Sequence, residues 1–142
     1  KAFAFTKPKV AGLDFSFSGL KTAILYFIQK NQKENPSFIE DNKNDICASI
    51  QDTIIEILMD KLKQAVKETG INQIAIGGGV SANSGIRSTL KEAEKKYGWK
   101  TFIPKFEYTT DNAAMIGIVG YQKYLSQHFE PASVVSKARI QF

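Results

Sequence analysis

The sequence predicts an α/β domain, and three observations carry that prediction. A short apolar run over residues 73–76 ends in three consecutive glycines and is followed by a helical pattern. A second apolar run, residues 100–103, also stands before a helical pattern. Strands that alternate with helices form a parallel unit with right-handed crossovers. The chain has 142 residues, 43% of them hydrophobic, which is enough for a core without disulfides or a structural metal.

The first residues predict two short strands and a helix. Residues 2–5 alternate with aromatic side chains, as an edge strand ended by Pro8 would. Residues 13–18 alternate as well, with Asp14, Ser16 and Ser18 on the polar side. A helix then opens at Gly19, and Ser18 can serve as its N-cap or face a cleft. Its apolar stripe consists of Leu20, Ile24, Phe27 and Ile28.

The longest predicted helix covers residues 45–69. Apolar residues recur at every fourth position, and Gly70 suits the C-cap. Residues 31–44, which include Pro36, are polar and are predicted to be a mobile loop. The recurring positions are Ile46, Ile50, Ile54, Leu58, Leu62 and Val66.

The second half repeats a strand–helix order. The strand 73–76 precedes a helix over 82–97 that Gly98 closes, and the strand 100–103 ends at Pro104. A loop over 105–110 then leads into a last helix over 111–127. The apolar face of that helix includes Ala114, Ile118 and Tyr121.

Composition limits the class of protein. The formal net charge of +5 favours anionic partners, although the lysines at 91, 95 and 96 are typical of a solvated helix face. No run approaches the ~18 apolar residues of a membrane span, and no signal-peptide pattern is present. Cys47 is the single cysteine and falls in a helical apolar pattern, which predicts a core position and a reducing compartment. We therefore expect a cytoplasmic protein without a membrane partner.

The glycine junction is the best candidate for chemistry. A strand that ends in glycines before a helix N-terminus presents backbone N–H groups to an anion or nucleotide. Glycine is expected there because a Cβ would block the turn and keep a ligand off the main chain. Residues 77–82 match G-x-G-x-x-A. However, the acid that would hold a ribose is missing, since the nearest one, Glu107, lies beyond Pro104. A tight strand–helix connection without a ligand is the alternative.

Asp111 is the second candidate. It stands at the start of the last predicted helix, where it can act as an N-cap. Alternatively, it can point into a cleft and hold a metal or a phosphate-bound cation. His128, the one histidine, has no second histidine or cysteine to form a metal pair, so a surface role is expected. A Ser-His-Asp hydrolase is not expected, because the serines lack a histidine base.

Three segments then occur in a recognisable order: LDFSFSGLKT at 13–22, GGVSAN at 78–83 and TDNAAM at 110–115. Together they resemble the TsaD family of tRNA threonylcarbamoyladenosine transferases, formerly described as O-sialoglycoprotein endopeptidases or glycoproteases. The resemblance covers essentially the whole chain. It implies an actin-like lobe (the ASKHA, ribonuclease H-like ATPase fold) with a mixed sheet flanked by helices. Residues 1–142 would form a single C-terminal lobe of a two-lobed protein whose N-terminal, metal-binding half is absent from this chain.

The resemblance also implies an activity. Members of the family move threonylcarbamoyl from threonylcarbamoyl-AMP to N6 of adenosine 37 in tRNAs that read A-starting codons. Gly78, Gly79 and Asn83 would bind this substrate or an ATP-type ligand, and Asp111 would complete a site for one divalent iron or zinc ion. No catalytic residue is assigned. The expected partners are tRNA, TsaB-like and TsaE-like subunits, and the N-terminal lobe of the same protein.

The chain departs from the family pattern in ways that matter for activity. The family's His-x-x-x-His metal ligands, its Ser-Gly-Gly phosphate loop and an upstream aspartate are missing. We therefore expect this polypeptide alone to be inactive and to bind adenine nucleotide weakly at best. The alternative function is a non-catalytic nucleotide- or partner-binding lobe that acts as a scaffold. Lys21 and Arg87 either touch tRNA phosphate or cover a helix surface, and both interpretations stay open.

Overall fold

Helices dominate the part of the chain that the computed structural model describes, residues 2–136. The helices are α1 (Ser18–Glu34), α2 (Phe38–Thr69), α3 (Ser84–Tyr97) and α4 (Ala113–Leu125). The strands are β1 (Gln73–Ala75) and β2 (Lys100–Phe102), and two 3₁₀ turns, η1 (Gly79–Ala82) and η2 (Phe106–Tyr108), follow them.

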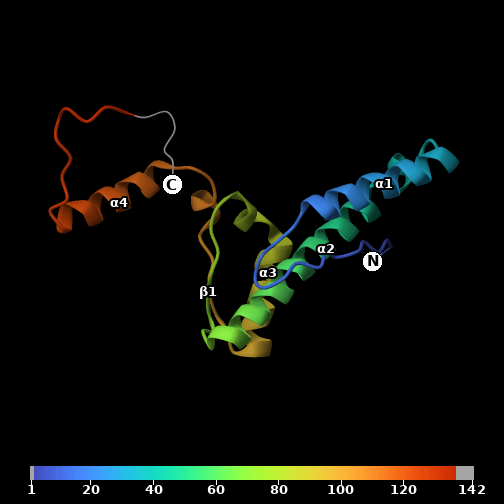
Figure 1. Cartoon of the computed structure of the whole chain (residues 1–142), viewed down its shortest axis with the longest axis horizontal. Helices are drawn as coiled ribbons and strands as arrows, with labels where there is room; N and C mark the ends of the chain where they lie inside the picture. Colours follow the sequence, from blue (N-terminus) through green and yellow to red (C-terminus); the bar gives the residue numbers. More distant parts are fainter. Residues whose placement is uncertain (1, 137–142) are drawn as a thin grey trace.

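The helices α1 and α2 form an antiparallel hairpin (Figure 1). With 32 residues, α2 is about 48 Å long at 1.5 Å per residue. The mobile loop predicted for 31–44 is wrong, because α1 runs to Glu34 and α2 already begins at Phe38. The buried ring of Phe38 packs edge-on against Phe27 of α1, with centroids 5.8 Å apart, and this contact holds the hairpin end. The predicted C-cap is confirmed, since Gly70 has a φ of 71°.

The strand predicted for residues 2–5 is wrong. Phe3 and Phe5 lie against Phe27, with ring centroids 5.1 and 5.2 Å away, and pair with no strand in residues 2–136. Both phenylalanines are half-buried, whereas Ala4 between them is exposed. The alternation therefore indicates an extended chain with one buried side. That side packs against helices and does not belong to a sheet.

The strand predicted for residues 13–18 is also absent. Phe15 and Phe17 stack on each other, with centroids 6.0 Å apart, and are 47% and 41% exposed. The proposed cap is wrong as well, because Ser18 is the first helical residue and Phe17 occupies the N-cap position without a side-chain bond. The Phe17 carbonyl accepts from Lys21 N at 2.9 Å, so the backbone alone starts α1.

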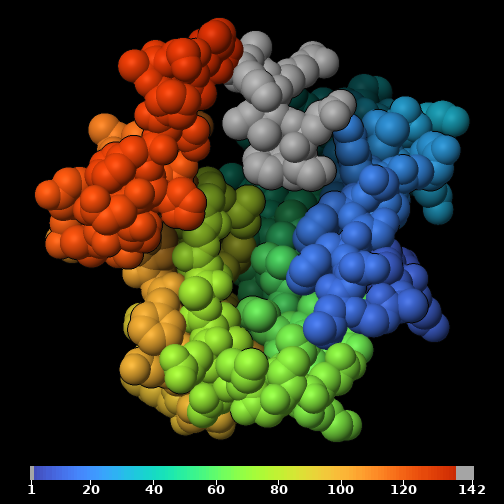
Figure 2. Space-filling view, turned by 60° about the vertical axis from the view of Figure 1, so that its left-hand side comes forward, coloured from blue at the N-terminus to red at the C-terminus, as the bar shows by residue number. Residues whose placement is uncertain are grey.

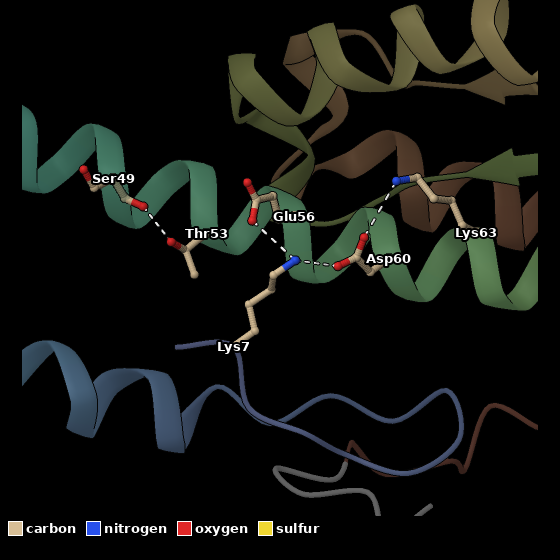
Figure 3. Close-up of polar contacts among 6 residues, drawn as sticks. All are labelled: Lys7, Ser49, Thr53, Glu56, Asp60 and Lys63. Carbon is tan, nitrogen blue, oxygen red and sulfur yellow. Dashed lines mark hydrogen bonds and ion pairs between the residues drawn. The ribbon is translucent and has the colours of Figure 1, made fainter. Parts of the chain in front are cut away.

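An N-terminal strap, residues 2–12, lies along α2. Lys7 donates to Asp60 at 2.6 Å and pairs with Glu56 at 3.3 Å (Figure 3). The hydrogen bond with Lys7 lowers the pKa of Asp60 below its ordinary value. Farther along, Lys61 donates to the carbonyls of Val10 and Gly12. These contacts attach the strap to one side of α2.

The sheet is small and parallel. Gln73 pairs with Lys100 and Ala75 with Phe102, and α3 makes the crossover between the strands. The expected α/β class is therefore confirmed, with two paired strands within residues 2–136. The core lies between α2, α3 and β1, and Trp99, the residue before β2, closes it. Its buried members are Met59, Ile74, Ile86, Leu90, Ala93 and Trp99.

Cys47 is exposed, so its predicted core position is wrong. Its neighbour Ile46 is only 5% exposed and carries the buried stripe of α2. One residue further along a helix turns the side chain by about 100°, which takes Cys47 off that stripe.

The last helix, α4, stands apart from the others. In Figures 1 and 2 it lies at the opposite end of the molecule from α1. None of its residues is buried, so the apolar face predicted there has no cover within residues 2–136. Over the same residues, no helix combines the length and apolar character needed to cross a membrane.

Candidate functional site

The glycine turn follows β1 directly and differs from the expected geometry. Gly78 has φ 75° and ψ 176°, a conformation that essentially only glycine adopts. A Cβ built on Gly77 or Gly79 meets no atom within 4 Å. The expectation that any Cβ would block the turn is therefore wrong. Position 78 requires glycine because of its backbone conformation. At positions 77 and 79 the missing side chain leaves open space beside the main chain.

Internal bonds hold this turn. The buried Ser81 donates to the Gly78 carbonyl from both its hydroxyl, at 2.7 Å, and its backbone N–H, at 3.0 Å. One 3₁₀ turn, η1, thus separates the glycines from α3, which was predicted to begin at Ala82 and begins at Ser84. These bonds close the turn with its own residues.

Asn83 joins the turn to two helices. Its side-chain oxygen accepts from Ile86 N at 3.0 Å and so caps α3, while its amide nitrogen donates to Gln51 of α2 at 3.1 Å. Gly85 permits this close approach, because a Cβ there would lie 2.7 Å from Cδ1 of Ile55. The residue expected to contact substrate is therefore also a structural link between α2 and α3.

A cavity of about 650 Å³, here called the central cavity, opens beside the turn. Its walls come from α1, α2 and the η1–α3 junction and are mostly apolar; Lys21 and Asn83 are the polar exceptions. Within residues 2–136, the side chain of Lys21 has no hydrogen-bond or ion-pair partner. The lining residues are Phe17, Leu20, Lys21, Ile24, Ile54, Leu58, Val80, Asn83 and Ile86.

The residues predicted to bind substrate line the central cavity or lie next to its wall. Asn83 lies on its wall, and Gly78 and Gly79 immediately precede its wall residue Val80. The contributions of Phe17 and Ile24 were missed, because Phe17 was assigned to a strand and Ile24 only to a core stripe. The helical stripe that contains Leu20 and Ile24 was the signal that could have revealed this wall.

The second predicted segment leaves the same edge of the sheet, because β1 and β2 run parallel. After β2 the chain makes η2, where the buried Thr109 donates from its hydroxyl to the Phe106 carbonyl at 2.7 Å. Asp111 follows, exposed and without a hydrogen-bond or ion-pair partner in residues 2–136. The cap of α4 is Asn112, whose side chain accepts from Met115 N at 3.2 Å. The N-cap interpretation of Asp111 is therefore wrong.

A metal site cannot be completed by the described residues alone. Between residues 2 and 136, no three His, Cys, Asp or Glu side chains gather closely enough to hold an ion. Asp111 can offer one carboxylate, and a single carboxylate does not hold a transition metal tightly. Asp111 also does not line the central cavity.

The remaining candidates divide clearly. His128 is exposed beyond α4, in line with the surface role expected for it. Lys21 lines the central cavity, whereas Arg87 is half-buried and binds two backbone carbonyls.

The parallel strand pair, the glycine turn and the helix after it define an α/β protein with a strand–glycine–helix site. The family described as "TsaD: tRNA N6-adenosine threonylcarbamoyltransferase" matches residues 1–118. This match covers most of the chain, and the chain belongs to that family.

Several curated relatives carry the name tRNA N6-adenosine threonylcarbamoyltransferase. The protein of Christiangramia forsetii is 68% identical over 142 residues, which are 100% of this chain and 42% of the relative. That of Riemerella anatipestifer is 56% identical over 97% of this chain and 40% of its own length. That of Porphyromonas gingivalis is 55% identical over 98% and 41%. The chain thus spans about two fifths of the length of these relatives.

Proposed function

We propose that this chain is the nucleotide-binding part of a longer enzyme, which transfers threonylcarbamoyl from threonylcarbamoyl-AMP to N6 of adenosine 37 in tRNA. The observation that carries the proposal is the central cavity beside the glycine turn. Its volume of about 650 Å³ falls within the range of roughly 300–1,000 Å³ for small-molecule sites. The names of the relatives supply the reaction class.

The chemistry of the walls suits an adenine nucleotide. A flat base gains from contact with apolar side chains such as Phe17 and Ile24. Asn83 uses one hydrogen of its amide for Gln51 and one lone pair for Ile86, which leaves one donor and one acceptor. An adenine edge presents the complementary acceptor and donor. The bare backbone at Gly77 and Gly79 gives the rest of the nucleotide access to the turn.

Holding the nucleotide in one orientation is the contribution we assign to this chain. Fixed orientation of two reactants can supply a large part of a rate enhancement. Asp111 would add one ligand to a divalent iron or zinc site, and the other ligands would come from the part of the relatives' length that this chain does not cover. The proposed partners are tRNA and TsaB-like and TsaE-like subunits, in the cytoplasm.

Complementation tests the proposal. The full-length gene is expressed in cells depleted of their own transferase, and tRNA nucleosides are measured by mass spectrometry. Wild type is expected to restore threonylcarbamoyladenosine, and Asp111→Ala to lose at least tenfold. Asn112→Ala is the matched control: it removes the cap of α4, at about 1 kcal/mol of stability, but keeps the carboxylate, and it should retain most of the product.

A third variant separates the two roles of Asn83. Serine is also a good N-cap, so Asn83→Ser keeps the cap of α3 but removes the amide, and with it the bond to Gln51. Gln51→Ala loses the same bond and keeps Asn83, so it is the matched control. Product should fall severalfold in Asn83→Ser but not in Gln51→Ala, while the thermal midpoints of the two purified variants stay close. If soluble wild type restores no product with its partners present, the transferase proposal fails and the scaffold function replaces it. If Asp111→Ala restores product fully, Asp111 has no ligand role.

A further inference from the structure

Arg87 connects the two segments that carry the candidate site residues. Its Nη1 donates to the Ser81 carbonyl in η1 at 2.9 Å, and its Nη2 donates to the Pro104 carbonyl after β2 at 2.8 Å. One side chain on the first turn of α3 therefore bonds to both the glycine turn and the start of the segment that leads to Asp111.

The chemistry of these two bonds requires arginine. One acceptor is a carbonyl in the last turn of η1 and the other lies just beyond β2, positions where internal partners run out. A guanidinium offers several donors in one plane and can bind two acceptors at once, whereas a lysine ammonium is a point charge on a flexible stem. Within residues 2–136, Arg87 pairs with no carboxylate, so its side chain is committed to these carbonyls.

Each segment otherwise has only its own local bonds. In the glycine turn, the Ser81 hydroxyl donates to the Gly78 carbonyl. In the η2 segment, Tyr108 N donates to the Lys105 carbonyl at 3.0 Å, and the Thr109 hydroxyl donates to the Phe106 carbonyl. Neither set crosses from one segment to the other. The strand pair and the bonds from Thr101 to Glu94 of α3 hold the elements that precede the two segments, and Arg87 is the side chain that bonds to both segments directly.

We infer that Arg87 is a positioning residue that fixes the Pro104–Asp111 segment against the glycine turn, so that a nucleotide at the turn faces Asp111 in one geometry. This inference rests on the proposed function for its effect on rate, but the link itself does not. A displacement of about 1 Å at a reacting centre can lower a rate on the order of a hundredfold. Arg87 then affects the rate of transfer more than the affinity for nucleotide.

The first arm of the test needs no activity. Hydrogen exchange is followed by mass spectrometry in the full-length protein, as wild type, Arg87→Ala, Arg87→Lys and Lys95→Ala. The peptide covering 105–112 should exchange at least fivefold faster in both Arg87 variants. Lys95→Ala is the matched control, because it removes an exposed cation two turns along α3 that bonds to neither segment, and its exchange should equal that of wild type.

The second arm measures transfer to tRNA with the reconstituted partners, and AMP affinity by calorimetry. Arg87→Ala should lower kcat at least tenfold while the AMP dissociation constant changes less than threefold, and Arg87→Lys should fall between wild type and alanine. Arg87→Lys also covers the case in which the alanine variant does not fold. Unchanged exchange in the 105–112 peptide, or a loss in affinity that matches the loss in rate, would overturn the inference. If the Arg87 variants exchange faster but the wild-type protein modifies no tRNA, the proposed function is overturned, while the role of Arg87 in joining the two segments still holds.

Discussion

At the scale of single residues, the glycine turn shows that three adjacent glycines have different reasons to be there. Gly78 adopts a backbone conformation closed to other residues, with a φ of 75°. Gly77 and Gly79 face open space and have no such need. The turn therefore depends on one glycine for its shape, and the other two leave room for a ligand.

Substitution separates these roles. Gly78→Ala should lower the free energy of unfolding of the intact protein by about 1–3 kcal/mol, the cost of a residue forced into that region. Gly79→Ala should change it by less than about 0.5 kcal/mol, as an exposed substitution does, but should weaken AMP binding because a methyl group enters the approach to the backbone. Urea unfolding and calorimetry measure the two effects. Equal losses of stability in both variants would contradict this division.

The candidate site was predictable where residue chemistry is local. The strand, the glycine turn and the helix after them were found from sequence because they follow one another within a few residues, whereas Asn83 was expected only from the family resemblance. The α1 wall of the central cavity, with Phe17 and Lys21, was not found, because about sixty positions separate it from the turn in sequence. The cap of α4 was misassigned to Asp111, since Asp and Asn cap equally well and adjacent positions cannot be distinguished by residue type.

At the scale of elements, α3 is linked to β2 through Glu94. Its carboxylate accepts from the hydroxyl and the backbone N–H of Thr101 and pairs with Lys91 at 3.1 Å. These hydrogen bonds favour the charged form and lower the pKa of Glu94 from 4.5 to about 2. The helix that follows the glycine turn is thereby fixed to the strand that precedes Asp111.

This link predicts a pH dependence of stability. Because the pKa of Glu94 is lower in the folded than in the unfolded chain, its contribution is complete above pH 4.5 and is lost as the pH falls toward about 2. The free energy of unfolding of wild type should fall more steeply over that interval than that of Glu94→Gln. Glu92→Gln is the control, since Glu92 has only a long contact of 3.4 Å with Ser88. Identical slopes for wild type and Glu94→Gln would refute the role of Glu94.

Element prediction succeeded where a pattern was intrinsic to one segment. The C-caps Gly70 and Gly98 were correct because a glycine in the left-handed region ends a helix whatever surrounds it. The strands at 2–5 and 13–18 failed because alternation shows only that one side is buried, while a strand also needs a neighbour to pair with. The start of α2 was placed seven residues too late, because its first two turns are polar apart from Phe38 and Ile39.

At the scale of the whole molecule, α4 is the least covered element. Its apolar side chains include Ile116 and Val119, which are 77% and 55% exposed. Soluble monomers rarely expose a continuous apolar face of this kind. The chain also spans only about two fifths of its relatives, so contacts that cover α4 can lie in the remaining length.

Expressed by itself, this chain should therefore self-associate through α4. Light scattering after size exclusion should give a mass above 15.8 kDa that rises with concentration. The double substitution Ile116→Lys and Val119→Lys should shift the mass toward the monomer. Ile71→Lys, at a position 60% exposed outside α4, should leave it unchanged. A monomer of wild type at all concentrations would refute the prediction.

The N-terminal strap also bears on the order in which the molecule assembles. Its bonds to α2 join residues 46, 51 and 53 positions apart, whereas α1 and α2 meet across a connection of three residues. Contacts of short sequence separation close faster. The helix hairpin therefore can form before the strap docks on it, and the wall that α1 and α2 give to the central cavity does not depend on the strap.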